Sequence, residues 1–270
     1  MTPIAKGGGR QSGRKGKVTG LEPVLSQLTD AEMIEFSEAP ATLPPETRIY
    51  AIGDIHGCLD RLTLLHEAIA EDLLARPVAD ALMLHIGDYI DRGPDSAQVI
   101  ALLRGPSPVP GTRRINLMGN HEDMLTSAMA AEDDAAAFNW LQNGGRETLA
   151  SWCVPHNLPR AAWPGRLPEP DLEFLRSLPL SHSEGAYFFA HAGIRPGVAL
   201  DQQDRHDLLW IREPFLSFKG DFGTVVVHGH TPGRTPVIRS NRVCIDTGAV
   251  YGGPLTCAVL ETNQLGFLTA

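Results

Sequence analysis

Short apolar runs recur along the chain, and most of them end in a glycine beside a polar side chain. These runs, rich in β-branched and aliphatic residues, cover 48–53, 81–87, 114–119, 186–193, 224–230 and 242–248. Their composition and length predict buried strands. Apolar residues also recur at helical spacing over 59–73, after the first run, and over 95–104, after the second. The first half of the chain is therefore predicted to be a βαβαβ unit with parallel strands, which indicates an α/β fold.

The rest of the chain departs from this alternation in two places. Residues 132–180 are rich in Ala, Trp and Pro and contain helix-like stretches but no good strand. We therefore expect a small helical insertion, or cap, in this segment. In the last third, the predicted strands follow one another closely, with only short turns between them. This spacing predicts a second sheet with antiparallel pairing.

Length and composition narrow the class of protein. The chain has 270 residues and a mean hydropathy of -0.10, which favours a globular protein with one domain over residues 45–270. No uncharged apolar stretch approaches the roughly 20 residues that a membrane helix requires, so no membrane partner is expected. The four cysteines include no CxxC pair. We expect free thiols and a cytoplasmic location.

The first residues differ in charge from the body of the chain. Residues 1–20 hold five of the 23 basic residues and none of the 32 acidic ones, together with several glycines. Such a segment buries too little apolar surface to offset its ordering entropy, so we predict a disordered basic tail. A nucleic-acid-binding arm is the alternative, but the acidic body offers no basic groove to extend it. No nucleic-acid partner is therefore expected.

Polar side chains able to bind metal follow five of the predicted strands. They lie in the motifs GDIHG (53–57), GDYIDRG (87–93), GNHE (119–122), HAG (191–193) and HGH (228–230). In open α/β sheets the carboxyl ends of the strands form the ligand crevice, so loops that are distant in sequence can converge there. The sequence therefore predicts one shared site.

Each motif taken alone has a simpler interpretation. Asp54 and His56 could form a turn that leads into a helix, and Asn120 could cap the helix that follows it. His191 could be a hydrogen-bonded core histidine, and Arg92 a surface ion-pair partner of a neighbouring aspartate. Independent capping needs would not, however, place such residues at successive strand ends. Oxygen and imidazole ligands without thiolate favour a pair of divalent ions such as Mn, Fe or Zn.

The ordered motifs GDIHG, GDYIDRG, GNHE, HAG and VHGHT resemble the signature of the phosphoprotein-phosphatase family of metallophosphoesterases. The resemblance is to the small bacterial and bacteriophage-type members, and it spans about residues 48–261. It implies a calcineurin-like fold, in which two mixed β-sheets pack as a sandwich flanked by α-helices. It also implies two metal ions, with Asp88 as the bridging ligand. The other implied ligands are Asp54 and His56 for one ion, and Asn120, His191 and His230 for the other.

The resemblance also assigns roles in phosphoryl transfer. His121 is expected to be the general acid that protonates the leaving group, and Asp91 to be its partner. Arg92 and Arg212 are expected to bind phosphoryl oxygens, with Asn120 also near the substrate. Two cations about 3.5–4 Å apart can generate a hydroxide nucleophile, neutralise the ester and align an in-line attack.

Four side chains near the motifs also have a simpler interpretation. Arg212 could form a surface ion pair with Glu213, and Tyr251, expected to overhang the site, could equally be a packed turn residue. Trp210 is interpreted as a core residue rather than a substrate platform. His228 matches no ligand position in this family, so we expect it to be an inward-facing strand residue.

The resemblance leaves two hydrolytic functions open. The first is a protein phosphatase that acts on phosphoserine or phosphothreonine, with phosphotyrosine or a small phosphoester as further options. The second is a symmetrical bis(5'-nucleosyl)-tetraphosphatase, a class that typically has alanine in place of Asp91 and aspartate in place of Glu122. This chain has DRG and GNHE, which favours the phosphatase. A catalytically inactive metal-binding module and a redox di-metal oxygenase fit less well, because every matched ligand is present and none lies in a Glu-x-x-His helix motif.

Overall fold

The strand-forming runs assemble into two sheets. The structure, a computed structural model, describes residues 1, 34–130, 134–155 and 157–270. Residues 34–270 form one compact unit. The segment predicted to be a basic tail, residues 1–20, lies outside the described residues apart from Met1.

The first sheet contains the predicted βαβαβ unit. Its strands, in spatial order, are β1 (Ser37–Glu38), β11 (Gln264–Thr269), β10 (Thr256–Glu261), β2 (Thr47–Ile52), β3 (Asp80–His85) and β4 (Thr112–Asn116). Strands β2, β3 and β4 run parallel to one another, which confirms the predicted direction. The crossover helices are α1 (Leu59–Ala75) and α2 (Ser96–Arg104). Strand β10 pairs antiparallel with both β2 and β11, so the sheet is mixed.

The second sheet differs from the prediction in the direction of its central strands. Its spatial order is β5 (Ser181–Glu184), β6 (Tyr187–Ala190), β7 (Val225–His228), β9 (Arg242–Cys244) and β8 (Val237–Ile238). Strands β6, β7 and β9 are parallel, and only the edge strands β5 and β8 are antiparallel to their neighbours. The predicted antiparallel pairing is therefore wrong for the centre of the sheet. The segments 191–224 and 229–241 are long enough to return the chain in the same direction.

The two sheets pack face to face, and helices cover their outer sides, because successive side chains of each strand point to opposite faces. The other helical elements are α3 (Asn120–Ala130), α4 (Ala135–Trp140), η1 (Leu141–Gly145), α5 (Arg146–Ser151), η2 (Arg160–Ala162), α6 (Glu169–Ser177), η3 (Leu200–Gln202), α7 (Arg205–Trp210) and η4 (Ala249–Tyr251). Leu84 of β3 shares a buried cluster with Val227 of β7, between the sheets. Met83, pointing the opposite way, packs toward α1 and α2. Val226 packs with Leu208 of α7 on the outer side of the second sheet.

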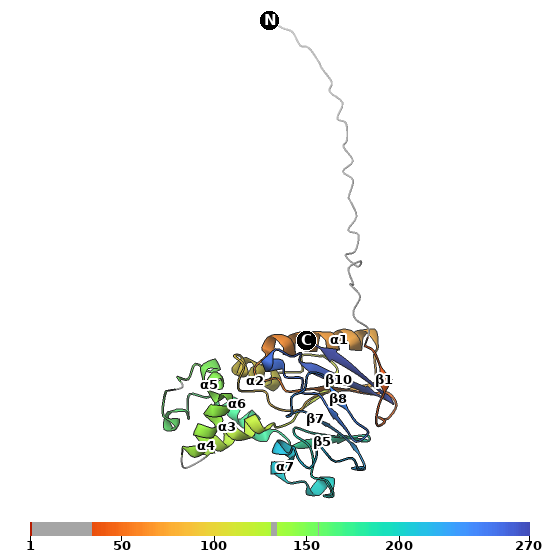
Figure 1. Cartoon of the computed structure of the whole chain (residues 1–270). Coiled ribbons are helices and arrows are strands. Elements are labelled where there is room, and N and C mark those ends of the chain that lie inside the picture. The colour runs from red at the N-terminus through yellow and green to blue at the C-terminus, as the bar shows by residue number, and fades with distance from the viewer. Residues whose placement is uncertain (2–33, 131–133, 156) are drawn as a thin grey trace. The chain divides into compact units, whose positions relative to one another are not determined.

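The segment predicted as a helical insertion contains helices and no strand in its described parts, 134–155 and 157–180. Its helices α4, α5 and α6 gather with α2 and α3 at one side of the two sheets, on the left in Figure 1. This placement brings α4 and α5 next to the loop that follows β3. Over the described residues, no helix is both long and apolar enough to cross a bilayer.

Candidate metal centre

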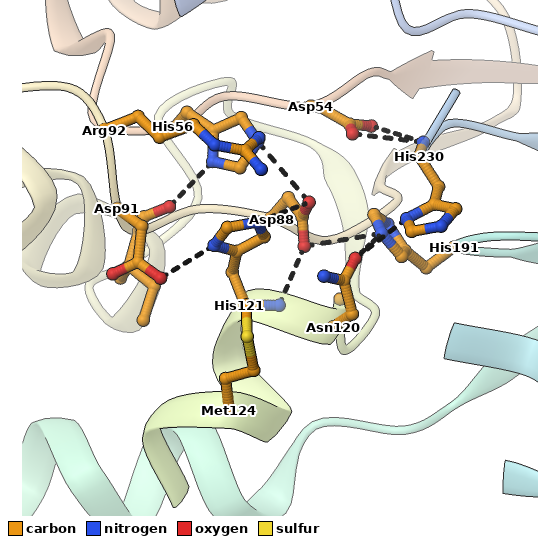
Figure 2. A network of polar contacts seen from close by, with 12 residues as sticks. Asp54, His56, Asp88, Asp91, Arg92, Asn120, His121, Met124, His191 and His230 are labelled. Carbon is orange, nitrogen blue, oxygen red and sulfur yellow. Dashed lines mark hydrogen bonds and ion pairs between the residues drawn. The ribbon is translucent and has the colours of Figure 1, made fainter. Parts of the chain in front are cut away.

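The predicted ligands converge at one edge of the two sheets. Asp54 and His56 follow β2, Asp88 follows β3, and Asn120 opens α3 after β4. Two histidines come from the second sheet: His191 follows β6, and His230 follows β7. All six side chains are buried, and Figure 2 shows them facing one another. The parallel direction of the strands explains the convergence, because their carboxyl ends meet at the same edge.

Asp88 lies between the two groups of ligands. Its Oδ2 atom is 3.4 Å from His56 Nε2, and its Oδ1 atom is 3.4 Å from His191 Nε2. Two sets of three side chains offer ligand atoms that all lie within 4.8 Å of one another, and Asp88 belongs to both: one adds His56 and His121, the other Asp54 and His191. A carboxylate with one oxygen toward each set has the arrangement that a bridging ligand needs.

The histidines present lone pairs to the centre. His56 Nδ1 is 2.8 Å from the Ile90 carbonyl oxygen, and His191 Nδ1 is 3.1 Å from that of Ile86. Each ring therefore donates from Nδ1, which directs its Nε2 atom into the site as a possible ligand atom. Burial lowers the pKa of His191 to about 3 and that of His230 to about 2. These rings are neutral near pH 7, as metal ligation requires.

The second group closes around Asn120. Its Oδ1 atom lies 2.8 Å from His191 Nε2 and 2.9 Å from His230 Nδ1. The other ring nitrogen of His230, Nε2, is buried without a hydrogen-bond partner. The His230 backbone N–H donates to Asp54 at 3.1 Å, which links the two groups. A buried polar atom without a partner is uncommon in proteins and fits a site that receives a ligand.

Three acidic side chains are buried close together at the centre. Burial raises the pKa of Asp54 and Asp88, and repulsion from the neighbouring aspartates adds to the effect at Asp54. Asp246, in the loop after β9, joins them, and burial raises its pKa to about 6. Asp246 was not among the predicted site residues, although it lies at the end of the apolar run 242–248. Carboxylates crowded against neutral imidazoles form a donor set that fits divalent cations.

Two glycines let the backbone approach these carboxylates. A Cβ atom at Gly119 would collide with the Asp88 carboxylate, and one at Gly229 would collide with that of Asp54. Both glycines immediately precede a predicted ligand, Asn120 or His230. These two motifs therefore need glycine beside the polar residue, because any larger side chain would overlap a carboxylate.

Non-glycine residues with a left-handed backbone gather at this centre. Their φ angles are +45° for His56, +55° for Asp88, +73° for Asp91, +70° for Arg92 and +63° for His230. This conformation costs a non-glycine residue roughly 1 kcal/mol or more, and it persists where surrounding contacts fix it. The clustering indicates that contacts with the surrounding structure, and not the intrinsic backbone preference of these residues, fix the conformation of the loops.

Glu122 is the residue that connects two of the loops. It is fully buried, and its Oε2 atom accepts hydrogen bonds from the backbone N–H groups of Asp88 at 2.9 Å and Gly119 at 2.8 Å. Its Oε1 atom accepts from Tyr89 at 2.8 Å and Ile90 at 3.3 Å. In the sequence, Glu122 served only to distinguish two enzyme classes, whereas in the structure its side chain fixes the backbone that carries Asp88.

His121 and Asp91 form a buried pair beside the predicted ligands. His121 Nδ1 lies 2.7 Å from Asp91 Oδ2, while its Nε2 atom is 3.9 Å from Asp88 Oδ2. Burial lowers the pKa of His121 to about 4, and the Asp88 carboxylate opposes this shift. Burial also raises the pKa of Asp91, against hydrogen bonds from Thr148 and Trp140. An acid role for His121 therefore depends on an ionised Asp91, whose charge would favour the protonated ring.

A cavity of about 220 Å³ opens over the centre and is lined in part by Arg92, Arg212, Tyr251, Trp210 and Asn143. The Arg92 side chain is 2.5 Å from His56 Nε2, and its guanidinium lies 5.7 Å from the centre of the Tyr251 ring. Trp210 is half-buried and packs against the main apolar cluster, as predicted for a core residue. Its ring also lines the cavity, where it lies edge-on to the ring of His230. Its place at the end of α7, beside the turn to Arg212, aims it there.

Arg212 and His228 have contrasting surroundings. Arg212 is exposed at the cavity, and Glu213, its predicted ion-pair partner, accepts a hydrogen bond from Ser217. His228 is fully buried in β7, with its ring 4.9 Å from that of Phe215. His228 is therefore buried as predicted, although its ring packs into the apolar cluster on the outer side of the second sheet rather than between the sheets.

A comparison with family models identifies the chain. The model described as calcineurin-like phosphoesterase matches residues 47–265. The chain belongs to this family. It is therefore a metal-dependent phosphoesterase with the buried Asp and His cluster described above.

Relatives of this phosphoesterase carry two kinds of name. It is 33% identical over 224 residues to serine/threonine-protein phosphatase 1 of Salmonella typhimurium, covering 79% of this chain and 92% of the relative. It is 29% identical over 189 residues to a symmetrical bis(5'-nucleosyl)-tetraphosphatase of Methylococcus capsulatus, covering 68% of this chain and 52% of that relative. A solved cold-active protein-tyrosine phosphatase of a Shewanella species aligns with a TM-score of 0.54 at 16% identity, over 86% of this chain and 84% of that one. This last likeness concerns the fold alone.

Proposed function

We propose that this phosphoesterase is a protein phosphatase that hydrolyses phosphoserine and phosphothreonine. The observation that carries the proposal is the buried pair in which Asp91 lies 2.7 Å from His121. Tetraphosphatases of the symmetrical class typically lack an aspartate at this position and have a shorter acid where Glu122 stands. The Salmonella phosphatase supports the same choice, since it is 33% identical over 79% of this chain.

Two divalent ions, Mn, Fe or Zn, would be held by the converging side chains. Asp54, His56 and Asp88 would bind one ion, and Asp88 would bridge to the other. The second ion would be completed by Asn120, His191 and His230. When bound, the ions supply a nucleophile from water and offset the charge of the phosphoryl group.

The remaining side chains would act on the substrate itself. Arg92 and Arg212, at the cavity, would bind phosphoryl oxygens, and a guanidinium can contact two of them at once. His121 would donate a proton to the departing serine or threonine oxygen, with Asp91 holding its ring. Tyr251, 66% exposed at the rim, would contact the part of the substrate that lies outside the cavity.

The second candidate is a symmetrical bis(5'-nucleosyl)-tetraphosphatase. It is supported by the Methylococcus relative and by two aromatic side chains at the cavity, Trp210 and Tyr251. Aromatic rings of this kind can stack on a nucleobase.

A direct comparison of substrates tests the proposal. The metal-loaded protein is assayed with a phosphoserine peptide and with diadenosine tetraphosphate, and with His191→Ala as the control that removes a ligand. We expect kcat/KM to be at least about tenfold higher for the peptide, the difference that one specific contact can supply. A preference for the dinucleotide would replace the proposal with the second candidate. Turnover of neither compound would refute both.

A further inference from the structure

The helical insertion contributes two fully buried polar side chains to the space behind His121. Trp140 is the last residue of α4, and Thr148 lies in the middle of α5. Both have no exposed surface, and both reach the carboxylate of Asp91. A buried hydroxyl and a buried indole N–H in helices usually hydrogen-bond locally or to packing neighbours. Here both side chains instead donate to Asp91, in the loop that follows β3.

Asp91 is surrounded by donors. Thr148 Oγ1 donates to Asp91 Oδ1 at 2.6 Å, and Trp140 Nε1 donates to Oδ2 at 2.9 Å and to Oδ1 at 3.0 Å. His121 Nδ1 takes the remaining direction at Oδ2. The carboxylate is therefore held from both sides, and among the described residues its hydrogen-bond partner on the side of the metal centre is His121. Hydrogen bonds to an ionised acceptor are roughly twice as strong as neutral ones.

The insertion also holds the backbone of the same loop. The Asp91 N–H donates to Thr148 Oγ1 at 2.8 Å, and the Arg92 N–H donates to the Gly144 carbonyl at 3.2 Å. Both Asp91 and Arg92 have left-handed φ angles, which outside contacts must stabilise. Gly144 itself has φ +107°, and a Cβ there would lie 2.6 Å from Arg92 N. One short helical stretch, 140–148, thus fixes both the side chain and the backbone of Asp91.

We propose that Thr148 and Trp140 are positioning residues for proton transfer, which hold Asp91 so that the His121 ring keeps its Nε2 atom directed at the leaving group. This inference rests on the proposed acid role of His121. It makes the insertion part of the machinery for the chemical step, in addition to any influence on substrate choice.

The test uses the leaving group as the readout. p-Nitrophenolate leaves readily as an anion, whereas phenolate, a stronger base, gains more from a general acid. For metal-loaded Thr148→Ala, kcat with phenyl phosphate should fall about tenfold more than kcat with p-nitrophenyl phosphate, as for loss of one charge-assisted hydrogen bond. Thr148→Ser should restore the wild-type ratio. Equal losses for the two substrates would overturn the inference.

Ser151→Ala is the matched control. Ser151 lies on the same helix, and its Oγ accepts the Ala97 N–H at 3.0 Å, so this variant removes a hydroxyl between helices without touching Asp91. Its substrate ratio should equal that of the wild type, and a changed ratio would show that any loosening of α5 has the same effect. Trp140→Phe is the second variant, and it should show the same selective loss with phenyl phosphate. It takes the place of Thr148→Ala if that variant does not fold.

His121→Asn separates this inference from the proposed function. If His121→Asn selectively slows phenyl phosphate while Thr148→Ala and Trp140→Phe do not, the acid role stands and the positioning role is refuted. If His121→Asn slows both substrates equally, the acid role fails, and the positioning role fails with it. Selective losses in all three variants, with metal content unchanged, would support both.

Discussion

Replacing Glu122 by glutamine should destabilise the fold strongly, although the change is nearly isosteric. Burial beside Asp88 favours a protonated carboxyl, but two N–H donors on each oxygen leave no acceptor for a carboxyl proton. We therefore treat Glu122 as ionised. Glutamine would put an NH₂ group where one oxygen accepts two backbone N–H groups. Each buried donor left without an acceptor costs about 1–3 kcal/mol, so the expected loss is roughly 2–6 kcal/mol.

Urea unfolding followed by circular dichroism measures this loss. The protein is first treated with a chelator, because bound metal would add its own stabilisation. Glu147→Gln is the control, since it is the same substitution at an exposed position of α5 and should change the free energy of unfolding by no more than about 0.5 kcal/mol. If Glu122→Gln is no less stable than Glu147→Gln, the four hydrogen bonds do not hold the loops as described.

Three further predictions concern the centre and the core. The Asp88→Asn variant should bind fewer than two ions per chain, the number expected of the wild type. Asparagine tolerates the left-handed φ of this position, so the backbone should keep its shape. An elemental analysis that finds two ions would refute the bridging role. Arg92→Ala should lower kcat/KM about a hundredfold, with Arg92→Lys recovering only part of it; equal activity of alanine and lysine variants would speak against two-oxygen binding. His66 Nε2 lies 3.0 Å from His85 Nε2, and burial lowers the pKa of His66 to about 4. The unfolded chain therefore binds the proton first, and stability should fall as pH drops from about 6.5 to 4; His66→Gln should flatten that slope in urea titrations at several pH values.

The first sheet could be predicted because its signals are local. The apolar runs of β2 and β3 are buried on both faces, and the helices between them show a clear apolar repeat. The direction of the central strands in the second sheet could not be predicted in the same way. Strand direction there depends on how the long segments 191–224 and 229–241 return the chain, and the regular elements in them, η3, α7 and β8, are short. The pairing of β10 with β2 depends on contacts distant in sequence and went unpredicted.

The ligand residues could be predicted from their position after strands and beside glycines. The structure brings all six together, while their individual roles stay predictions. Glu122, Asp246, Trp140 and Thr148 were not singled out for the site. Trp140 and Thr148 lie in helices, where a buried tryptophan or threonine looks like ordinary packing in the sequence, and only the fold places them against Asp91.

The position of β10 between β2 and β11 has a consequence for synthesis on the ribosome. Strand β2, which leads directly into Asp54 and His56, gains β3 as one neighbour early, but its other neighbour comes from residues 256–261. Until that late segment emerges, β2 is an open edge able to pair with another nascent chain. The loop that carries Asp54 and His56 can therefore reach its final shape only after residues 256–261 have left the ribosome.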